Sequence, residues 1–476
     1  MAQASPQAHA LDVVGLAESP HRSILRLAAP TVFAMLLQSA VNEIDVVFFS
    51  RLPCPEASNA QAALLPSLIM VWLFGGSLSA ISVGTQAHTA RRHAEKDYDA
   101  AGAVLANSAL FCLIAGVLFS LLGGATIHWL LSRMIKKPEV LEIAYDYSRW
   151  RLLGIVSMAM TIGVKSFFDG IGKTYVHLVA SVVMNVFNVL FCWIFIFGHF
   201  GAPRMGAAGA GLGAFLSTWI GLFIVLYFAW RERDAYRPFR RSNLSFQLTG
   251  DLVKLSLPAA FATIAMMGGF GVFTSFAGQL DDQVGRMVNS LCGGYEAVNG
   301  AATTNIVALM KLTFTACLAF GTATATLVGQ SLGSKRDDLA TKFGWASVKL
   351  GLVIFGVVGL AEGVLFTRPI VGFLTHSPLV GEAMIMPLRV MGVVTPLVAV
   401  AMILSEALFG AGATKFVAAA QFVLVFFGLV PLAWFLSLKL DFGLVGMWLA
   451  AALYAILASA TMSLKFRSGS WKSIRI

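Results

Sequence analysis

A carboxylate and two amides share one face of the first apolar segment of the chain, at about residues 25–50. Gln38, Asn42 and Asp45 are spaced i, i+4 and i+7, and this spacing aligns side chains on one side of an α-helix. A charge at bilayer depth costs about 2.5–3.5 kcal/mol, so such residues usually have a function. Burial favours the neutral form of a carboxyl group. We therefore predict that Asp45 binds and releases a proton near neutral pH.

A second polar stripe lies in the apolar segment 175–198. Ser181, Asn185, Asn188 and Cys192 follow one another at i, i+4, i+7 and i+11. If the two stripes face each other, they enclose a small polar chamber around the carboxylate. Interhelical hydrogen bonding, which is common for amides inside membranes, is the alternative interpretation of Asn185 and Asn188.

Two further residues of the first segment bear on its shape and charge. Pro30 removes a backbone hydrogen bond from the helix and permits a bend, so we expect a hinge there. Glu43 points about 200° away from Asp45 around the helix axis, so it belongs to another face. Its role stays open between substrate contact and charge pairing.

Four more charged residues fall within apolar segments. Lys165 and Asp169 are four residues apart, the spacing of an ion pair along one helix, and we expect them to pair. Lys311 and Glu406 lie in different segments of the second half. We expect these two to pair as well, with contact between Lys311 and an anionic substrate as the alternative.

The composition predicts the elements that position these residues. Of the 476 residues, 58% are hydrophobic and only 12% are charged, against roughly 25% charged in soluble domains. These values exclude a soluble enzyme, a disordered chain and a disulfide scaffold. A bilayer span takes about 20 apolar residues. The apolar runs predict an all-α integral membrane protein with twelve spans, at about 25–50, 60–84, 100–122, 151–169, 175–198, 207–230, 252–277, 301–327, 342–366, 384–409, 415–438 and 444–465.

The net charge of +10 follows the predicted topology. With the N-terminus inside, inner segments carry 20 of the 34 Lys and Arg residues and outer segments carry 11. This bias predicts that both termini are cytoplasmic, and it removes the reason to expect a nucleic-acid partner. Residues 1–20 lack the pattern of a cleaved signal peptide. Five outer charges cluster in 133–151, which we expect to lie along the membrane interface.

The second half of the chain repeats the first. RLAAP at 26–30 matches KLSLP at 254–258, Arg151 and Gly154 match Arg389 and Gly392, and GIG at 170–172 matches GAG at 410–412. Six spans per copy give both copies the same orientation, an arrangement that suits a transporter in which one bundle rocks against the other. The predicted parts are a cytoplasmic tail at 1–23, a first lobe at 24–230, a cytoplasmic linker at 231–250, a second lobe at 251–466 and a tail at 467–476.

Several motifs are absent from the sequence. It contains no G-x-x-x-x-G-K-[ST] loop for ATP and no HExxH or GxSxG motif. The five cysteines show no metal-binding spacing, although Cys54 and Cys292, in predicted outer loops, are candidates for a disulfide. We expect no enzyme activity, no metal and no cofactor apart from a coupling ion.

Several of these patterns resemble the MATE (multidrug and toxic compound extrusion) family. RLAAP followed by VNEIDVVFFSRL is similar to the family's first span, and NVLFCWIFIFG at 188–198 is similar to its fifth. FDGIGKT and LFGAGAT resemble the glycine-rich turns after its fourth and tenth spans. The resemblance covers about residues 24–466. It implies a V-shaped, two-lobed exporter that exchanges organic, often cationic, compounds for H⁺ or Na⁺, with Asp45 as the coupling aspartate and Asn188 as the fifth-span asparagine.

The sequence also departs from the family pattern. Cys192 stands where relatives often carry Asp or Asn, and a thiol is a poor ligand for Na⁺. The seventh span and residues 390–400 lack the acidic residues of one branch of the family. We therefore expect H⁺ rather than Na⁺ as the coupling ion.

The resulting prediction is a secondary active transporter that exports organic cationic or amphipathic small molecules by antiport with H⁺. We expect a monomer in the bacterial inner membrane, with the substrate and the lipid bilayer as its partners. The alternatives are a lipid-linked or polysaccharide flippase of the wider superfamily, a major-facilitator carrier and a membrane-bound enzyme. The loop GTQAHTARRHAEKD lacks the usual major-facilitator pattern, and no clustered catalytic set is found.

Overall fold

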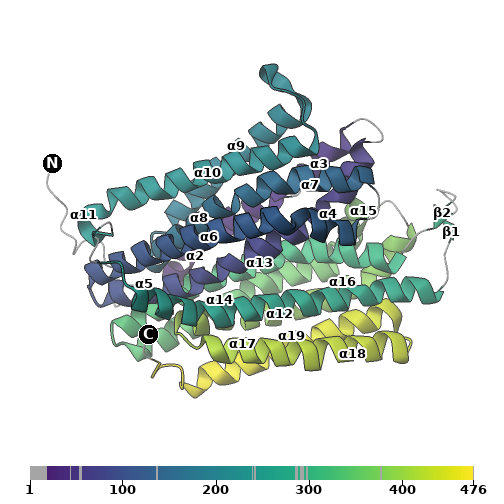
Figure 1. The fold of residues 1–476 in the computed structure, drawn as a ribbon. Helices are drawn as coiled ribbons and strands as arrows, with labels where there is room; N and C mark the ends of the chain where they lie inside the picture. Colours follow the sequence, from purple (N-terminus) through teal and green to yellow (C-terminus); the bar gives the residue numbers. More distant parts are fainter. Residues whose placement is uncertain are drawn as a thin grey trace.

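The helices of the chain run roughly side by side along one long axis (Figure 1). The computed structural model describes residues 19–42, 44–52, 56–135, 138–238, 240, 243–284, 288–289, 294–295, 298–375 and 378–474. Cys54 and Cys292, the predicted disulfide candidates, lie outside these residues.

The N-lobe comprises the elements before residue 240, in the purple to teal colours of Figure 1. They are α2 (Pro20–Asn42), α3 (Ile44–Ser50), α4 (Glu56–Phe74), η2 (Gly76–Ala80), α5 (Ile81–Ala94), α6 (Tyr98–Met134), α7 (Pro138–Leu153), α8 (Ile155–Gly170), α9 (Tyr175–Phe197), η3 (His199–Gly201), α10 (Ala207–Arg231) and α11 (Arg233–Tyr236).

The C-lobe comprises the elements after that connection, which run from teal (α12) through green to yellow in Figure 1. They are α12 (Phe246–Val284), β1 (Val288–Asn289), β2 (Gly294–Tyr295), α13 (Val298–Gly333), α14 (Asp337–Leu360), η5 (Ala361–Leu365), α15 (Thr367–Leu374), α16 (Pro378–Gly410), α17 (Thr414–Val423), η6 (Leu424–Leu429), α18 (Val430–Trp434), η7 (Phe435–Lys439) and α19 (Gly443–Ser468). The two short strands pair antiparallel, and every other regular element described is helical.

Local sequence signals set several helix ends. Asp97 caps the start of α6, because its carboxylate accepts a hydrogen bond from the Ala100 backbone N–H at 3.0 Å. Gly198 ends α9 with a φ of 81°, a left-handed conformation that glycine adopts without strain. These ends determine which turns of α6 and α9 lie within the bundle.

Within the described residues, nine helices are long and apolar enough to cross a membrane. Two bent pairs, Pro66–Phe74 with Gly76–Ala94 and Pro138–Leu153 with Ile155–Gly170, raise the number to eleven if each pair is one span. The remaining predicted span, at about 25–50, corresponds to α2 (Pro20–Asn42) and α3 (Ile44–Ser50). The all-α membrane fold predicted from the sequence is confirmed.

The segment expected along the membrane interface packs against other helices of the bundle. Residues Pro138–Leu153 form α7, which meets α8 at a bend of 42° and packs against both α4 and α10. Its charges are compatible with this position because the exposed Arg149 and Asp146 pair with each other at 3.4 Å. Where this stretch lies relative to the membrane interface stays a prediction.

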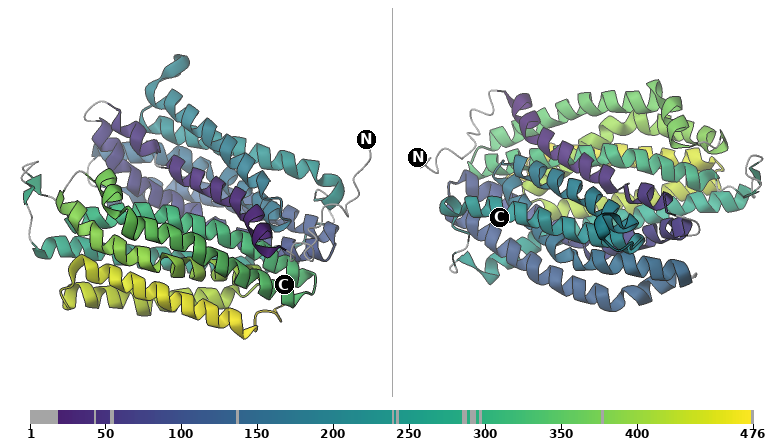
Figure 2. Two further views of the ribbon diagram at one scale, coloured as in Figure 1. Left: turned by 180° about the vertical axis from the view of Figure 1, so that it is seen from behind. Right: turned by 90° about the horizontal axis from the view of Figure 1, so that it is seen from above.

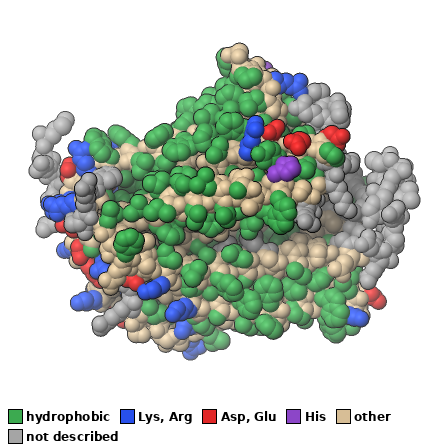
Figure 3. All heavy atoms as spheres, viewed as in Figure 1, with side chains coloured by type: hydrophobic (Ala, Val, Ile, Leu, Met, Phe, Trp, Pro, Cys, Tyr) green, Lys and Arg blue, Asp and Glu red, His purple; other side chains and the backbone are tan. Residues whose placement is uncertain are grey.

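The outside of the bundle is apolar where lipid would surround it. Figure 3 shows hydrophobic side chains across the middle of one face, while charged side chains gather toward the two ends. Large apolar residues such as Trp72, Leu121 and Val353 are more than 60% exposed. A water-soluble chain rarely exposes such a continuous apolar surface, whereas a membrane protein requires one.

The two lobes meet along α2, α5 and α13. A single apolar cluster joins Ile24, Leu27 and Ala28 of α2 to Phe320 and Leu327 of α13. Both views in Figure 2 show the C-terminus at one end of the bundle, and Figure 1 shows β1 and β2 at the opposite end. Helices α5, α8, α13 and α16 finish at one end of the bundle, where Ile474 also lies. We call this the closed end, because the contacts described below join the two lobes there.

Candidate coupling site and the contacts at the closed end

Asp45 lies in the first turn of α3 and is only 7% exposed. The Tyr147 hydroxyl donates a hydrogen bond to Asp45 Oδ2 at 3.1 Å. Arg151 Nη1 donates to the Tyr147 hydroxyl oxygen at 3.2 Å and lies 3.9 Å from the same carboxylate oxygen. Tyr147 and Arg151 are one turn apart on α7, so a single helix face supplies both partners. Asp45 therefore has an internal cation as its counter-ion.

Cys192 of α9 contacts the other oxygen of the carboxylate. Its Sγ atom lies 3.8 Å from Asp45 Oδ1 and 3.7 Å from the backbone oxygen of Ala210. Glycines in α10 allow this approach, because a Cβ atom on Gly213 would lie 2.9 Å from the Cys192 backbone nitrogen. A Cβ atom on Gly209 would lie 2.5 Å from the backbone oxygen of Phe195. Close packing of α9 on α10 thus holds the thiol beside Asp45.

A cavity of about 70 Å³ adjoins this group. Asp45, Arg151, Asn185 and Asn188 line it, together with Ser217, among others. Asn188 Nδ2 donates to Ser217 Oγ at 3.2 Å, whereas neither amide atom of Asn185, which is 2% exposed, has a hydrogen-bond partner in the described part of the chain. A cavity of this size has room for water, which would satisfy that amide. Asp45 of the first predicted stripe and Asn185 and Asn188 of the second thus line one polar cavity.

The remaining residues of the first stripe are only partly described. Gln38 and Asn42 belong to the last two turns of α2, and the structure describes their backbone but not their side chains. Glu43 lies outside the described residues. Helix α2 continues through Pro30, and its end is at Asn42. The coupling role of these residues and the hinge at Pro30 stay predictions.

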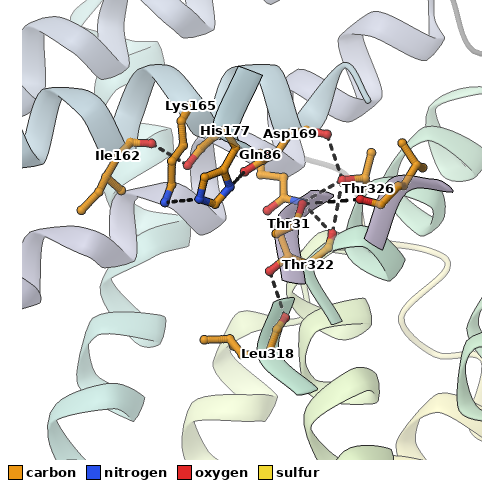
Figure 4. A network of polar contacts seen from close by, with 11 residues as sticks. Thr31, Gln86, Ile162, Lys165, Asp169, His177, Leu318, Thr322 and Thr326 are labelled. Carbon is orange, nitrogen blue, oxygen red and sulfur yellow. Dashed lines mark hydrogen bonds and ion pairs between the residues drawn. The ribbon is translucent and has the colours of Figure 1, made fainter. Parts of the chain in front are cut away.

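The sequence suggested an ion pair between Lys165 and Asp169, but in the structure the two side chains do not pair directly. His177 of α9 lies between them (Figure 4): Lys165 Nζ is 3.2 Å from His177 Nε2, and His177 Nδ1 is 3.7 Å from Asp169 Oδ2. Asp169 and His177 are 3% and 4% exposed. The turn at Gly170–Thr174 brings the start of α9 back beside the end of α8. His177 therefore lies in the space between Lys165 and Asp169.

Polar contacts between the lobes surround this group (Figure 4). Gln86 Nε2 of α5 donates to the Thr322 backbone oxygen and to Thr326 Oγ1 of α13, each at 2.9 Å. The Thr326 hydroxyl donates to the Asp169 backbone oxygen at 3.0 Å. Gln330 Nε2 donates to the Gly170 backbone oxygen at 2.8 Å. The last turn of α8 is therefore bonded to the opposite lobe.

Arg91 extends these contacts to the end of the bundle. It is 9% exposed, and it donates to the backbone oxygens of Ile474 at 2.7 Å and Ala411 at 2.9 Å. Trp471 is fully buried and stacks on Phe466 at a centroid distance of 4.7 Å. A buried guanidinium bonded to two carbonyl groups of the C-lobe holds the lobes together here.

The predicted pair in the second half does not form. Glu406 packs against Gly321 of α13, where a Cβ atom would lie 2.7 Å from the Glu406 Cγ atom. Lys311 lies ten residues earlier on the same helix, which corresponds to about 15 Å. Glu362 has its own partner, because Thr313 Oγ1 donates to Glu362 Oε1 at 2.9 Å. The structure therefore keeps Lys311 and Glu406 apart.

Sequence reasoning missed Tyr147, Arg151 and His177. Arg151 carried one usable signal, since it recurs with Gly154 as Arg389 with Gly392 in the second repeat. His177 also carried one, because it lies four residues before Ser181 and so extends the second polar stripe by one turn. Tyr147 had no comparable signal.

The family model MatE matches residues 30–194 and 283–435, which is more than half of the chain. The multidrug resistance protein PmpM of Pseudomonas aeruginosa is 27% identical over 350 residues, covering 70% of this chain and 68% of that protein. The probable multidrug resistance protein NorM of Thermotoga maritima is 22% identical over 459 residues, covering 95% and 93%.

Solved structures show the same fold. An outward-facing multidrug resistance MATE family transporter of the MOP superfamily has a TM-score of 0.83 at 22% identity, covering 96% of this chain and 98% of that one. A MOP superfamily transporter from Pyrococcus furiosus has a TM-score of 0.84 at 22% identity, with the same coverage. The match to the family model over both lobes, together with this fold, establishes that the chain belongs to the MATE family of membrane transporters.

Proposed function

We propose that the chain exports organic cationic or amphipathic small molecules by antiport with H⁺, as a monomer in the bacterial inner membrane with both termini in the cytoplasm. The names of its relatives support the substrate class, since PmpM and NorM are described as multidrug resistance proteins. The positive charge bias of the predicted inner segments supports the orientation. On this orientation the closed end faces the cytoplasm.

The contact between Asp45 and Arg151 is the observation that favours H⁺ over Na⁺ as the coupling ion. The carboxylate already has a guanidinium 3.9 Å away and a tyrosine hydroxyl at 3.1 Å. A sodium ion would have to enter beside this permanent positive charge, and the nearby thiol of Cys192 is a poor ligand for it. A proton needs no such space, because it binds covalently to the carboxylate oxygen.

The same charges explain why H⁺ and a cationic substrate would exclude each other. With Asp45 ionised, the positive charge of Arg151 is balanced within the cavity. Protonation of Asp45 leaves the guanidinium uncompensated and disfavours a second cation nearby. Protonation also removes the negative charge of Asp45, through which Tyr147 and Arg151 of α7 hold α3 in place. Helix α3 is then free to repack. We propose that this repacking drives the exchange of access between the two sides.

Replacing Asp45 with Asn should abolish proton-driven export without preventing folding. The test is uptake of a fluorescent quaternary ammonium dye into proteoliposomes under an imposed pH gradient or an imposed Na⁺ gradient. Asp146→Asn is the matched control, because Asp146 lies on α7 with a 43% exposed side chain paired to Arg149. Full transport by the Asp45 variant, or transport driven by the Na⁺ gradient alone, would contradict the proposed mechanism.

A further inference from the structure

Three basic side chains gather where α19 ends and the C-terminal tail begins. Lys465 and Arg467 lie in the last turn of α19, and Lys472 follows in the tail. Within the described residues, none of the three forms an ion pair with a carboxylate. Asp441 is the only acidic residue of the sequence in 407–476, and it lies near the opposite end of α19. The cluster therefore carries positive charge that nothing in the described chain neutralises.

The tail is held in a defined conformation beside the end of the helix. Gly469 has a φ of 69°, the left-handed conformation that lets the chain turn back after a helix. Trp471 is fully buried, and its Nε1 atom donates to the Phe466 backbone oxygen at 2.8 Å. Three residues later, the Ile474 backbone oxygen accepts a hydrogen bond from Arg91 of the N-lobe at 2.7 Å. The tail is thus attached at two points, and its remaining side chains project from a fixed backbone.

Hydroxyl and ammonium groups lie together at the turn formed by Gly469. Lys465 Nζ donates to Ser470 Oγ at 2.8 Å, and Ser468 Oγ lies 3.0 Å from the same Ser470 atom. A Cβ atom on Gly469 would lie 4.0 Å from Lys472 Nζ, so the second ammonium group lies beside the same turn. A lysine ammonium group has three donors, and Ser470 takes up one of those of Lys465. Two like charges with spare donors repel each other, and an anion placed between them would relieve this repulsion.

The outward face of α19 that leads to this turn is apolar. Five exposed residues recur at i, i+4, i+7, i+11 and i+14, namely Leu453, Leu457, Ala460, Leu464 and Arg467. This spacing places them on one side of the helix, and the yellow C-terminal helices lie at one edge of the bundle in Figure 1. From Leu453 to Leu464 the helix rises about 16 Å, and half of the hydrocarbon core of a bilayer is about 15 Å thick. The apolar face therefore has the length of one lipid leaflet, and Arg467 follows at the level of the headgroups.

We propose that Lys465, Arg467 and Lys472 form a binding site for the phosphate headgroup of an anionic phospholipid, whose acyl chains lie along the apolar face of α19. Ammonium and guanidinium groups bind phosphate oxygens through charge-assisted hydrogen bonds. A zwitterionic headgroup brings its own cation to the basic cluster, so it fits less well. The apolar face that leads to the basic groups favours a lipid over a soluble phosphate compound. The inference goes beyond the proposed function, because it assigns a lipid site that can be measured without substrate or ion gradient.

The test is native mass spectrometry of the purified full-length protein, titrated in detergent with phosphatidylglycerol or phosphatidylcholine. The parent protein should bind the first phosphatidylglycerol molecule more tightly than phosphatidylcholine. A basic residue near an anionic headgroup raises the affinity about fivefold. The triple variant Lys465→Gln, Arg467→Gln, Lys472→Gln should therefore bind phosphatidylglycerol about 100-fold more weakly, with its affinity for phosphatidylcholine unchanged.

A second triple variant is the matched control, because it removes the same charge from the same end of the bundle. Arg92, Arg237 and Arg336 each already pair with a carboxylate. Their replacement by glutamine should leave phosphatidylglycerol binding unchanged. An equal loss in the two triple variants would show that net charge alone attracts the lipid, and it would overturn the proposal. If the first triple variant fails to fold, Arg467→Gln alone, which changes an exposed side chain, should bind phosphatidylglycerol about fivefold more weakly.

Glycerol 3-phosphate distinguishes a lipid from a soluble phosphate compound, because it carries the phosphate group without acyl chains. Leu457→Gln with Leu464→Gln should weaken phosphatidylglycerol binding at least about tenfold and leave the binding of glycerol 3-phosphate unchanged. If glycerol 3-phosphate bound as tightly as phosphatidylglycerol, or if the leucine variant bound phosphatidylglycerol like the parent protein, the apolar face would not belong to the site. The assignment to a lipid would then be wrong.

Discussion

The guanidinium of Arg151 stabilises the ionised carboxylate of Asp45 inside the N-lobe. The Asp45 side chain is 9% exposed and the Arg151 side chain is 21% exposed, so little water is available to solvate either charge. A buried charge that loses its partner destabilises a protein far more than an exposed one does, since its desolvation is no longer compensated. The ion pair therefore affects both the stability of the N-lobe and the charge of the cavity beside Asp45.

Replacing Arg151 with Met should lower the free energy of unfolding by about 3–5 kcal/mol at neutral pH. The loss should shrink as the pH falls, because protonation of Asp45 removes the unpaired charge. Thermal unfolding in detergent, measured across a pH series, gives this comparison. The double variant Asp45→Asn, Arg151→Met is the control, and it should be more stable than the single Arg151 variant at neutral pH. An equal loss at every pH would show that Arg151 acts through packing alone.

The sequence could predict the candidate coupling residues that share a helix but not those that meet across helices. Helical periodicity alone aligns Asn185 with Asn188 and singles out Asp45, because 3.6 residues per turn relates positions within one segment. Tyr147 reaches Asp45 from 102 residues away, through a packing of α7 that no periodicity specifies. The many charged residues of 133–151 also suggested that this segment lies along the membrane interface. That interpretation gave no reason to expect Arg151 beside Asp45.

Close helix packing is the element-scale feature that assembles the site. The sequence predicted most helices because apolar runs of sufficient length are plain in it, whereas it did not show that α7 continues into α8 through a bend of 42°. Such a bend depends on what the helix packs against. In the same way, Gly209 and Gly213 resemble other glycines of the sequence, and only the structure shows that they lie against α9.

Adding a methyl group at Gly209 should separate α9 from α10. The new Cβ atom would lie 2.5 Å from backbone atoms of Phe195, which cannot rotate away as a side chain would. We expect Gly209→Ala to destabilise the protein by about 1–3 kcal/mol, the usual cost of overpacking. It should also reduce proton-driven transport, because α9 carries Cys192 and Asn185.

The matched control for this substitution is Gly124→Ala in α6, where nothing lies within 4 Å of the added atom. Alanine is the better helix former, so this variant should be unchanged or more stable by up to about 1 kcal/mol. Thermal unfolding and dye transport should be measured on both variants. Equal stability of the two would argue against close α9–α10 contact at this position.

At the scale of the whole molecule, polar bonds and apolar packing both join the lobes at the closed end. Gln86, Arg91 and Gln330 each donate from one lobe to a backbone oxygen of the other. These three bonds end on backbone carbonyl groups, so each can be exchanged for water when the lobes separate. Alternating access requires such a reversible closure.

A covalent bond across this closure should stop transport. Ala90 of α5 and Gly329 of α13 face each other so closely that a Cβ atom on Gly329 would lie 3.0 Å from that of Ala90. This is slightly under the usual disulfide spacing of about 3.5–4.5 Å, which a small shift would restore. Ala90→Cys with Gly329→Cys should therefore cross-link under mild oxidation, abolish transport and recover it on reduction. Each single cysteine variant should transport regardless of oxidation. If the cross-linked protein transported at the full rate, separation of the lobes at this end would not be part of the cycle, and substrate would have to leave the cytoplasmic side by another route.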